Sequence, residues 1–143
     1  MIATMAGYEL DDDPARVDRD TVRHLLATEA YRGRWRGREH VEQQIAGAWR
    51  VTGAYDSAGR TVGFARAISD AVAFAYLADV IVDPVARGHG LGVGLVELMI
   101  DDGPGRDFRW TLHTADAHDL YERFGFAPPD SNFLERRSAG APQ

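Results

Sequence analysis

The residues best suited to chemistry are closely spaced glycines after a long apolar run. The run 72–82 stops at Asp83-Pro84, and Arg87-Gly88-His89-Gly90-Leu91-Gly92 follows directly before a helical pattern. Such glycines let the backbone approach a ligand and turn successive N–H groups into one concavity. A helix that begins there adds the positive end of its dipole. The pattern predicts a turn that binds a phosphate or diphosphate, with Arg87 as a fixed positive charge beside it.

Other glycine-rich sites fit this stretch less well. A Walker A loop needs a lysine after its last glycine, and none follows here. A dinucleotide fingerprint needs a glycine where the chain has Val93 or Leu95, and starting it from Gly92 fails at Glu97. A turn that binds nothing is disfavoured, because glycine lowers helix stability.

Two motifs carry a resemblance to a known family. The stretch 87–92 resembles the Arg/Gln-x-x-Gly-x-Gly/Ala signature of the GNAT superfamily of N-acetyltransferases, and 80–84 resembles the end of that family's central strand. Leu120-Tyr121-Glu122-Arg123-Phe124-Gly125-Phe126 is similar to its Leu-Tyr-x-x-x-Gly-Phe block. The resemblance covers about residues 72–126; the first 70 residues match only in their predicted order of elements.

The resemblance implies acetyl-CoA as cosubstrate and a set of residues that hold it. Its pantetheine arm would lie beside the central strand, at the backbone of Ile81 and Val82. Thr114 stands where the family often has asparagine, and Asp116 or His113 could replace that contact. The diphosphate would lie on the amides of Arg87, Gly88, His89, Gly90, Leu91 and Gly92.

Tyr121 matches the tyrosine that protonates the departing thiolate in this family. A phenol with a pKa near 10 is protonated at neutral pH and close in basicity to a thiol. The alternative is a packing residue on a helix with Leu120 and Phe124. The chain has no cysteine, so no cysteine acyl-enzyme can form, and we expect direct attack by the amine.

Asp79 is the leading candidate for the base, because it lies two residues before Ile81 in an apolar strand and on the same face. A carboxylate there needs a function or a partner. The alternatives are a structural carboxylate and a base that acts through water.

Other polar and aromatic residues carry weaker predictions. His113, Asp116 and His118 do not predict a metal site, since histidines five residues apart do not share a helix face. The arginines at 32, 34, 36 and 38 are expected in a solvated turn, with a small basic patch for an anionic substrate or phosphate as the alternative. Trp35, with Tyr31 and Trp49 as weaker candidates, could line an acceptor pocket.

The elements that must position these residues follow from periodicity and turn signals. We expect a strand at Tyr8–Leu10, a helix capped by Asp18 or Asp20, and a second helix through Val41, Ile45 and Trp49. The remaining predictions are strands 49–55, 61–68, 72–82, 108–113 and 133–136, with helices 91–101 and 117–124. This order predicts an α/β fold: a mixed, mostly antiparallel sheet, GNAT-like, with helices on both faces.

Length, charge and composition narrow the class of protein. The 143 residues suit one domain, 1–143, and the net charge of −6 disfavours a nucleic-acid partner. No apolar run reaches the roughly 20 residues of a membrane span, and the start has no signal-peptide pattern. The lack of cysteine agrees with a cytoplasmic location, and a homodimer is the commonest assembly.

The sequence therefore predicts an acetyl-CoA-dependent N-acyltransferase that acts on a primary amine. A small-molecule acceptor is favoured, because the chain is short and has no extra peptide-binding segment. The alternative is a non-catalytic module of the same fold that binds acyl-CoA as a sensor or partner subunit.

Overall fold

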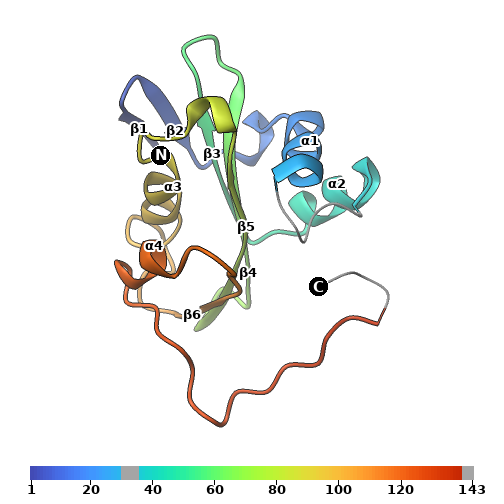
Figure 1. Ribbon diagram of the computed structural model, residues 1–143, viewed down its shortest axis with the longest axis vertical. Coiled ribbons are helices and arrows are strands. Elements are labelled where there is room, and N and C mark those ends of the chain that lie inside the picture. Colours follow the sequence, from blue (N-terminus) through green and yellow to red (C-terminus); the bar gives the residue numbers. More distant parts are fainter. Residues whose placement is uncertain (30–35, 140–143) are drawn as a thin grey trace.

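The computed structural model describes residues 1–29 and 36–139, and its centre is a mixed sheet (Figure 1). Strands follow one another in the order β1-β2-β3-β4-β5-β6. Neighbouring strands are antiparallel except β5 and β6, which are parallel. This confirms the predicted mixed, mostly antiparallel sheet. The strands are β1 (Ile2–Met5), β2 (Tyr8–Asp11), β3 (Arg50–Tyr55), β4 (Thr61–Ser69), β5 (Phe74–Val82) and β6 (Arg109–Leu112).

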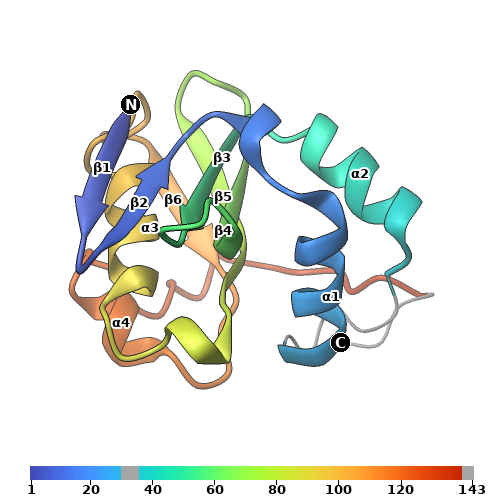
Figure 2. The same ribbon diagram turned by 90° about the horizontal axis from the view of Figure 1, so that it is seen from above.

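Helices cover both faces of the sheet, as predicted. Helices α1 (Arg19–Glu29) and α2 (Arg38–Ala46) lie on one face, and α3 (Leu91–Met99) and α4 (His118–Glu122) lie on the other (Figure 2). Two short 3-10 helices, η1 (Pro14–Arg16) and η2 (Pro84–Ala86), complete the elements. Each face has its own apolar core, one with α3 and Tyr121 and one with α1, α2 and Ile81.

Local sequence signals explain where the first two helices begin and end. Asp18 caps α1, because its carboxylate accepts hydrogen bonds from the amides of Asp20 (3.0 Å) and Thr21 (3.3 Å). Helix α2 ends at Ala46, so the prediction that Trp49 belongs to it is wrong. Instead, the Trp49 ring packs against the rings of Phe108 and Trp110.

Strands β5 and β6 pair over only part of their length. Phe74–Leu77 pairs with Arg109–Leu112, and beyond Leu77 no strand of the described chain lies on that side of β5. The unpaired half of β5, residues 78–82, leads directly into η2 and the glycine turn. This geometry leaves a free edge on the central strand, beside which the resemblance places the pantetheine arm.

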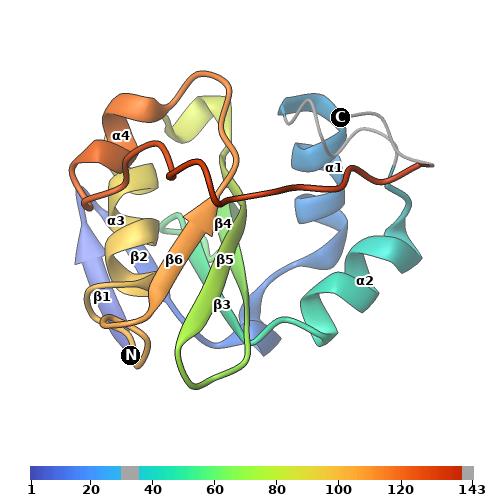
Figure 3. The same ribbon diagram turned by 90° about the horizontal axis from the view of Figure 1, so that it is seen from below.

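The two ends of the chain differ from the prediction. Strand β1 was not expected, because it is short and lies directly before β2 in a tight hairpin with positive φ at Ala6 and Gly7. The predicted final strand 133–136 is wrong, since these residues form no strand. They follow Pro128-Pro129 and run in an extended tail from the α4 side past β6 toward the α1 side (Figure 3).

Candidate active site

The glycine turn adopts the backbone conformation that its composition predicted. Gly88 has φ +83° and Gly90 has φ +77°, values that residues with a Cβ rarely adopt. The stretch from Arg87 to Gly90 is exposed, and α3 begins at Leu91 directly after it. The turn therefore presents its backbone to solvent at the start of a buried helix.

The first amides of α3 are available to a ligand. Gly90 is the N-cap and offers no side-chain acceptor, and the first backbone bond of the helix runs from the Gly94 amide to the Gly90 carbonyl (3.0 Å). The N–H groups of residues 91–93 thus point out of the helix end without a helical acceptor. With the helix dipole, they favour an anion at this place.

Side chains of the turn hold it to the rest of the protein. The Arg87 guanidinium donates to the Glu29 carboxylate at the end of α1 (2.9 Å). The His89 ring lies 5.3 Å from the Tyr8 ring, and its Nδ1 is 3.1 Å from the Ala86 carbonyl oxygen. Arg87 therefore has a carboxylate partner that an incoming diphosphate would have to displace.

The backbone of β5 presents Val82, rather than Ile81, to its unpaired side. The Asp83 amide donates to the Val62 carbonyl of β4 (2.8 Å). Because peptide groups alternate along a strand, those of Ile81 also face β4, where Ile81 lies opposite Phe64. Those of Val82 face the side where β6 no longer pairs. The strand geometry thus favours Val82 over Ile81 for the predicted backbone contact, and both contacts stay predictions.

Tyr121 lies in the core beneath α3, and its environment keeps its hydroxyl protonated. It is 9% exposed, and its ring meets Phe126 edge-on at 5.8 Å. Burial, with a smaller contribution from the charge of Asp116, raises the pKa of Tyr121 to about 12. The hydroxyl can therefore donate a hydrogen bond or a proton throughout the neutral range.

Thr114 helps to start the helix that carries Tyr121. Its Oγ1 accepts a hydrogen bond from the Ala117 amide (3.1 Å), at the beginning of α4. The hydroxyl proton stays free to be donated, so the predicted cosubstrate contact stays a prediction. The structure adds a positioning role for Thr114.

A bulge in β5 brings Asp79 to the α1 face of the sheet. The register jumps, since Phe64 lies opposite Ile81 while Arg66 lies opposite Ala78. Asp79 occupies the extra position with φ +58°, a left-handed value that asparagine and aspartate tolerate better than most residues.

Two arginines hold the Asp79 carboxylate. Arg36 reaches both oxygens (2.7 and 2.8 Å), and the Nε of Arg66 lies 2.6 Å from Oδ2. Arg36 also donates to Gln44 of α2 (2.6 Å), while its own Nε is buried and makes no hydrogen bond within residues 1–29 and 36–139. Arg36 and Arg66 are 6% and 8% exposed, so the cluster is desolvated and carries one excess positive charge.

This pairing weakens Asp79 as a base. Burial alone raises the pKa of Asp79, but the hydrogen bonds and charges of Arg36 and Arg66 together outweigh it, and the pKa is lowered. A carboxylate with a lowered pKa is a poor proton acceptor at neutral pH. The role of Asp79 in proton transfer stays a prediction, and the structure favours its alternative as a structural carboxylate.

Sequence reasoning missed several of these neighbours. Arg36 was expected in a solvated turn, yet it is buried against Asp79. No motif predicted a role for Arg66; the only indication was that a buried carboxylate such as Asp79 requires a partner. His113 accompanies Tyr76 and Glu135, which no motif singled out. Trp35 and Tyr31, expected near the acceptor, lie outside the described residues.

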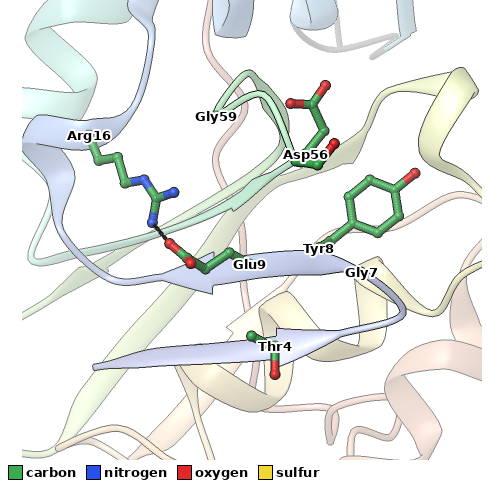
Figure 4. A pocket seen from close by; sticks show the side chains of 8 residues that line it. Thr4, Gly7, Tyr8, Glu9, Arg16, Asp56 and Gly59 are labelled. Carbon is green, nitrogen blue, oxygen red and sulfur yellow. Dashed lines mark hydrogen bonds and ion pairs between the residues drawn. The ribbon is translucent and has the colours of Figure 1, made fainter.

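A pocket away from the glycine turn contains none of the predicted site residues. A cavity of about 280 Å³ lies between the β1–β2 hairpin and the turn 56–59 (Figure 4). Its one cationic side chain, Arg16, is already paired with Glu9 and Asp11, and Asp56 adds another carboxylate. The excess of acid disfavours a diphosphate there.

Neither a metal cluster nor a membrane-spanning helix is found in the described part of the chain. Histidine, aspartate and glutamate residues do not gather there in a group of three that could hold an ion. The helices of residues 1–29 and 36–139 are also too short and too polar to cross a bilayer.

Comparisons with known proteins agree on one family. The model of the "Acetyltransferase (GNAT) family" matches residues 19–126. A crystal structure from Xanthomonas campestris pv. campestris, described as an acetyltransferase belonging to the GNAT family, has a TM-score of 0.87 at 31% identity. That alignment covers 96% of this chain and 97% of the other.

Two further relatives are more distant or partial. A Clostridium acetobutylicum acetyltransferase with acetyl-CoA has a TM-score of 0.64 over 96% of both chains, but its 13% identity shows the fold alone. Serotonin N-acetyltransferase 2, chloroplastic, of Oryza sativa subsp. japonica is 41% identical over 71 residues. This match spans 50% of the chain and only 34% of that relative.

Proposed function

The chain belongs to the GNAT acetyltransferase family, and on this premise we propose that it transfers an acetyl group from acetyl-CoA to the primary amine of a small molecule. The observation that carries this proposal is the pair of left-handed glycines, Gly88 and Gly90, which present the uncapped amides of α3 beside the unpaired half of β5.

The glycine turn fits the diphosphate of coenzyme A. Its exposed backbone donors and the helix dipole favour a negative group without any lysine. The Arg87 guanidinium can add a positive charge to this site once its ion pair with Glu29 breaks. Val82, at the unpaired edge of β5, offers an N–H and a C=O to the amide groups of the pantetheine arm.

Acetyl-CoA supplies an acetyl group activated as a thioester. The amine nitrogen forms the new N–C bond, the C–S bond breaks, the amine gives up a proton and the sulfur takes one. The chain has no cysteine, so no cysteine acyl-enzyme can form, and the proposal is that the amine attacks the thioester directly. The protein's residues must therefore bind acetyl-CoA and the amine, orient them for attack, and move two protons: one away from the amine and one to the sulfur.

Tyr121 is the proposed donor of the proton to sulfur. Its raised pKa of about 12 keeps the hydroxyl protonated at neutral pH. The same value makes Tyr121 a weaker acid than an ordinary phenol, and its O–H can also stabilise the forming thiolate by a hydrogen bond.

The acceptor is proposed to approach from the α1 and α2 face. That face carries Asp79 and its arginines, and it lies across the sheet from α3. One relative is named for serotonin, a small amine, which supports a small-molecule acceptor without identifying it. The cytoplasmic location and the homodimer stay predictions.

The absence of cysteine makes the test simple. Purified protein is mixed with acetyl-CoA and a panel of primary amines, and released CoA thiol is followed with a thiol reagent that finds no background in this chain. We expect saturable turnover with at least one small amine, and loss of acetyl-CoA binding in Arg87→Glu.

Calorimetry with acetyl-CoA separates the two functions weighed for this fold. Binding without turnover of any amine would contradict the transferase and support the non-catalytic acyl-CoA module. No binding at all would contradict both.

A further inference from the structure

Three side chains from distant segments form a hydrogen-bonded chain at the point where β5 and β6 separate. Tyr76 comes from β5, His113 directly follows β6, and Glu135 comes from the tail. The Tyr76 hydroxyl lies 2.7 Å from Nδ1 of His113, and Nε2 of the same ring pairs with the Glu135 carboxylate. Each imidazole nitrogen thus has its own partner.

The chemistry of the groups fixes the direction of the hydrogen bonds. An ionised carboxylate only accepts, so the Nε2–H of His113 donates to Glu135. In the neutral ring Nδ1 is then an acceptor, and it receives the O–H of Tyr76. A phenolic oxygen that donates its own O–H can also accept a proton from another group.

The chain lies where β5 and β6 separate. Tyr76 pairs with Thr111, the last pair is Leu77 with Leu112, and His113 is the next residue. Val82 and the glycine turn lie at the other end of the unpaired segment, about 16 Å away at the rise of an extended strand. An acyl group carried along β5 from the glycine turn therefore arrives near Tyr76.

We propose that Tyr76, His113 and Glu135 form the proton relay that deprotonates the acceptor amine. This inference rests on the proposed function and supplies the base that Asp79, held by two arginines, fits poorly. The amine proton passes to the Tyr76 oxygen as the Tyr76 proton passes to Nδ1 of His113. The imidazolium faces the Glu135 carboxylate and later releases its proton to water.

The groups around His113 determine how it can take up a proton. The described neighbours that face His113 are Tyr76 and Glu135, and Arg137 of the tail lies 4.0 Å from the other oxygen of Glu135. Tyr76 touches the substrate in this account and is its catalytic residue. His113 and Glu135 act through it and are positioning residues.

The competing explanation is a clasp in which His113 only anchors the tail through Glu135. Glu135→Gln separates the two, because the amide oxygen can still accept the Nε2–H bond while the negative charge is removed. A clasp would leave kcat and its pH dependence unchanged. A relay would lower kcat, because the carboxylate no longer stabilises the imidazolium.

Rates over a pH series with one fixed amine test the relay, since ionisation of the amine itself then cancels between variants. We expect kcat to fall about 10- to 100-fold in Tyr76→Phe, His113→Gln and Glu135→Gln. In Glu135→Gln the acidic limb of the profile moves to lower pH. Arg136→Gln, next to Glu135 in the tail, is the control and should match the wild type.

NMR of the imidazole nitrogens gives a readout without any substrate. We expect the Nε2–H tautomer, with an Nδ1 resonance that moves in Tyr76→Phe. An Nδ1–H tautomer, or three folded variants with the rate profile of the wild type, would overturn the relay. If the wild type itself transfers no acetyl group, the proposed function fails instead.

Discussion

Asp79 shows how neighbours, rather than position in a strand, decide what a carboxylate can do. The sequence correctly placed it on the face of Ile81 and correctly required a partner for it. The sequence did not reveal that a bulge in β5 would turn Asp79 to that face. It also did not reveal that the partner would be Arg36, which lies 43 positions away along the chain. Long-range pairing of this kind leaves no local pattern.

Replacing Asp79 tests its structural role. Asp79→Asn leaves two buried arginines without a counter-charge, so we expect a loss of about 3 kcal/mol in the free energy of unfolding, measured with urea. The exposed Asp107→Asn serves as the control. Equal urea midpoints for Asp79→Asn and the wild type would contradict the role.

The same variant has a defined pH dependence. The pKa of Asp79 is lowered in the folded state, so its stabilisation is complete above the ordinary value of 3.8 and disappears as pH falls through the lowered value. The difference in stability between the wild type and Asp79→Asn should therefore shrink only below about pH 4.

Tyr121 carries a prediction for catalysis. Tyr121→Phe keeps the ring and its contact with Phe126 but removes the proton donor. We expect kcat to fall about 10- to 100-fold with little change in the KM for acetyl-CoA. Unchanged kcat in the thiol assay would return Tyr121 to a packing residue.

At the scale of elements, the glycine turn was the most predictable feature, and the bulge within β5 and the C-terminal tail were the least predictable. The spacing of its glycines reports directly on local backbone conformation, and the structure gives the expected left-handed values. The bulge depends on the register between β4 and β5. The path of the tail depends on contacts with distant residues, such as the ion pair of Glu135 with His113. Neither can be read from a single segment, which is why a final strand was expected where none forms.

Two alanine variants separate backbone strain from bulk in this turn. Gly90→Ala forces a Cβ into φ +77° and should cost about 1 kcal/mol, and the relaxed turn should bind acetyl-CoA roughly tenfold more weakly. At Gly92 a Cβ would meet only Leu120, at an ordinary 3.5 Å. Gly92→Ala should therefore fold as stably as the wild type.

Thermal denaturation and acetyl-CoA calorimetry on both variants check this. A Gly90→Ala protein with the melting temperature and Kd of the wild type would show that the left-handed turn is not required.

At the scale of the whole molecule, the sheet divides the protein into two cores with different tasks. The α3 side holds the glycine turn and Tyr121, and the α1 side holds Asp79 and its arginines. The mixed sheet and its helices could be predicted, because hydrophobic periodicity and turn residues act locally. The contacts that join Tyr76 of β5, His113 after β6 and Glu135 of the tail could not be predicted, because they link segments that are distant in the sequence.

Both cores bury a tyrosine, and this predicts alkaline instability. Burial raises the pKa of Tyr55 and of Tyr121 from 10.0 to about 12. Their stabilisation is complete below pH 10 and is lost as pH rises toward 12. Melting temperatures should fall in that window, and they should fall less in Tyr55→Phe.

Tyr55→Phe should also be stable near neutral pH. The Tyr55 hydroxyl is buried and has no hydrogen-bond partner in the described part of the chain, and Arg16 stacks on its ring at 3.9 Å, a contact that phenylalanine keeps. An alkaline decline as steep as that of the wild type would show that Tyr55 does not titrate with unfolding.

The central claim is that backbone amides at the start of α3 hold the diphosphate of coenzyme A. The most direct measurement is a titration of ¹⁵N-labelled protein with CoA, followed by amide NMR. We predict saturable shifts concentrated on residues 88–92, with a further shift at Val82 of β5. If those amides stay in place while CoA is in excess, the cosubstrate site is not at this turn, and the account of acetyl transfer built on it is wrong.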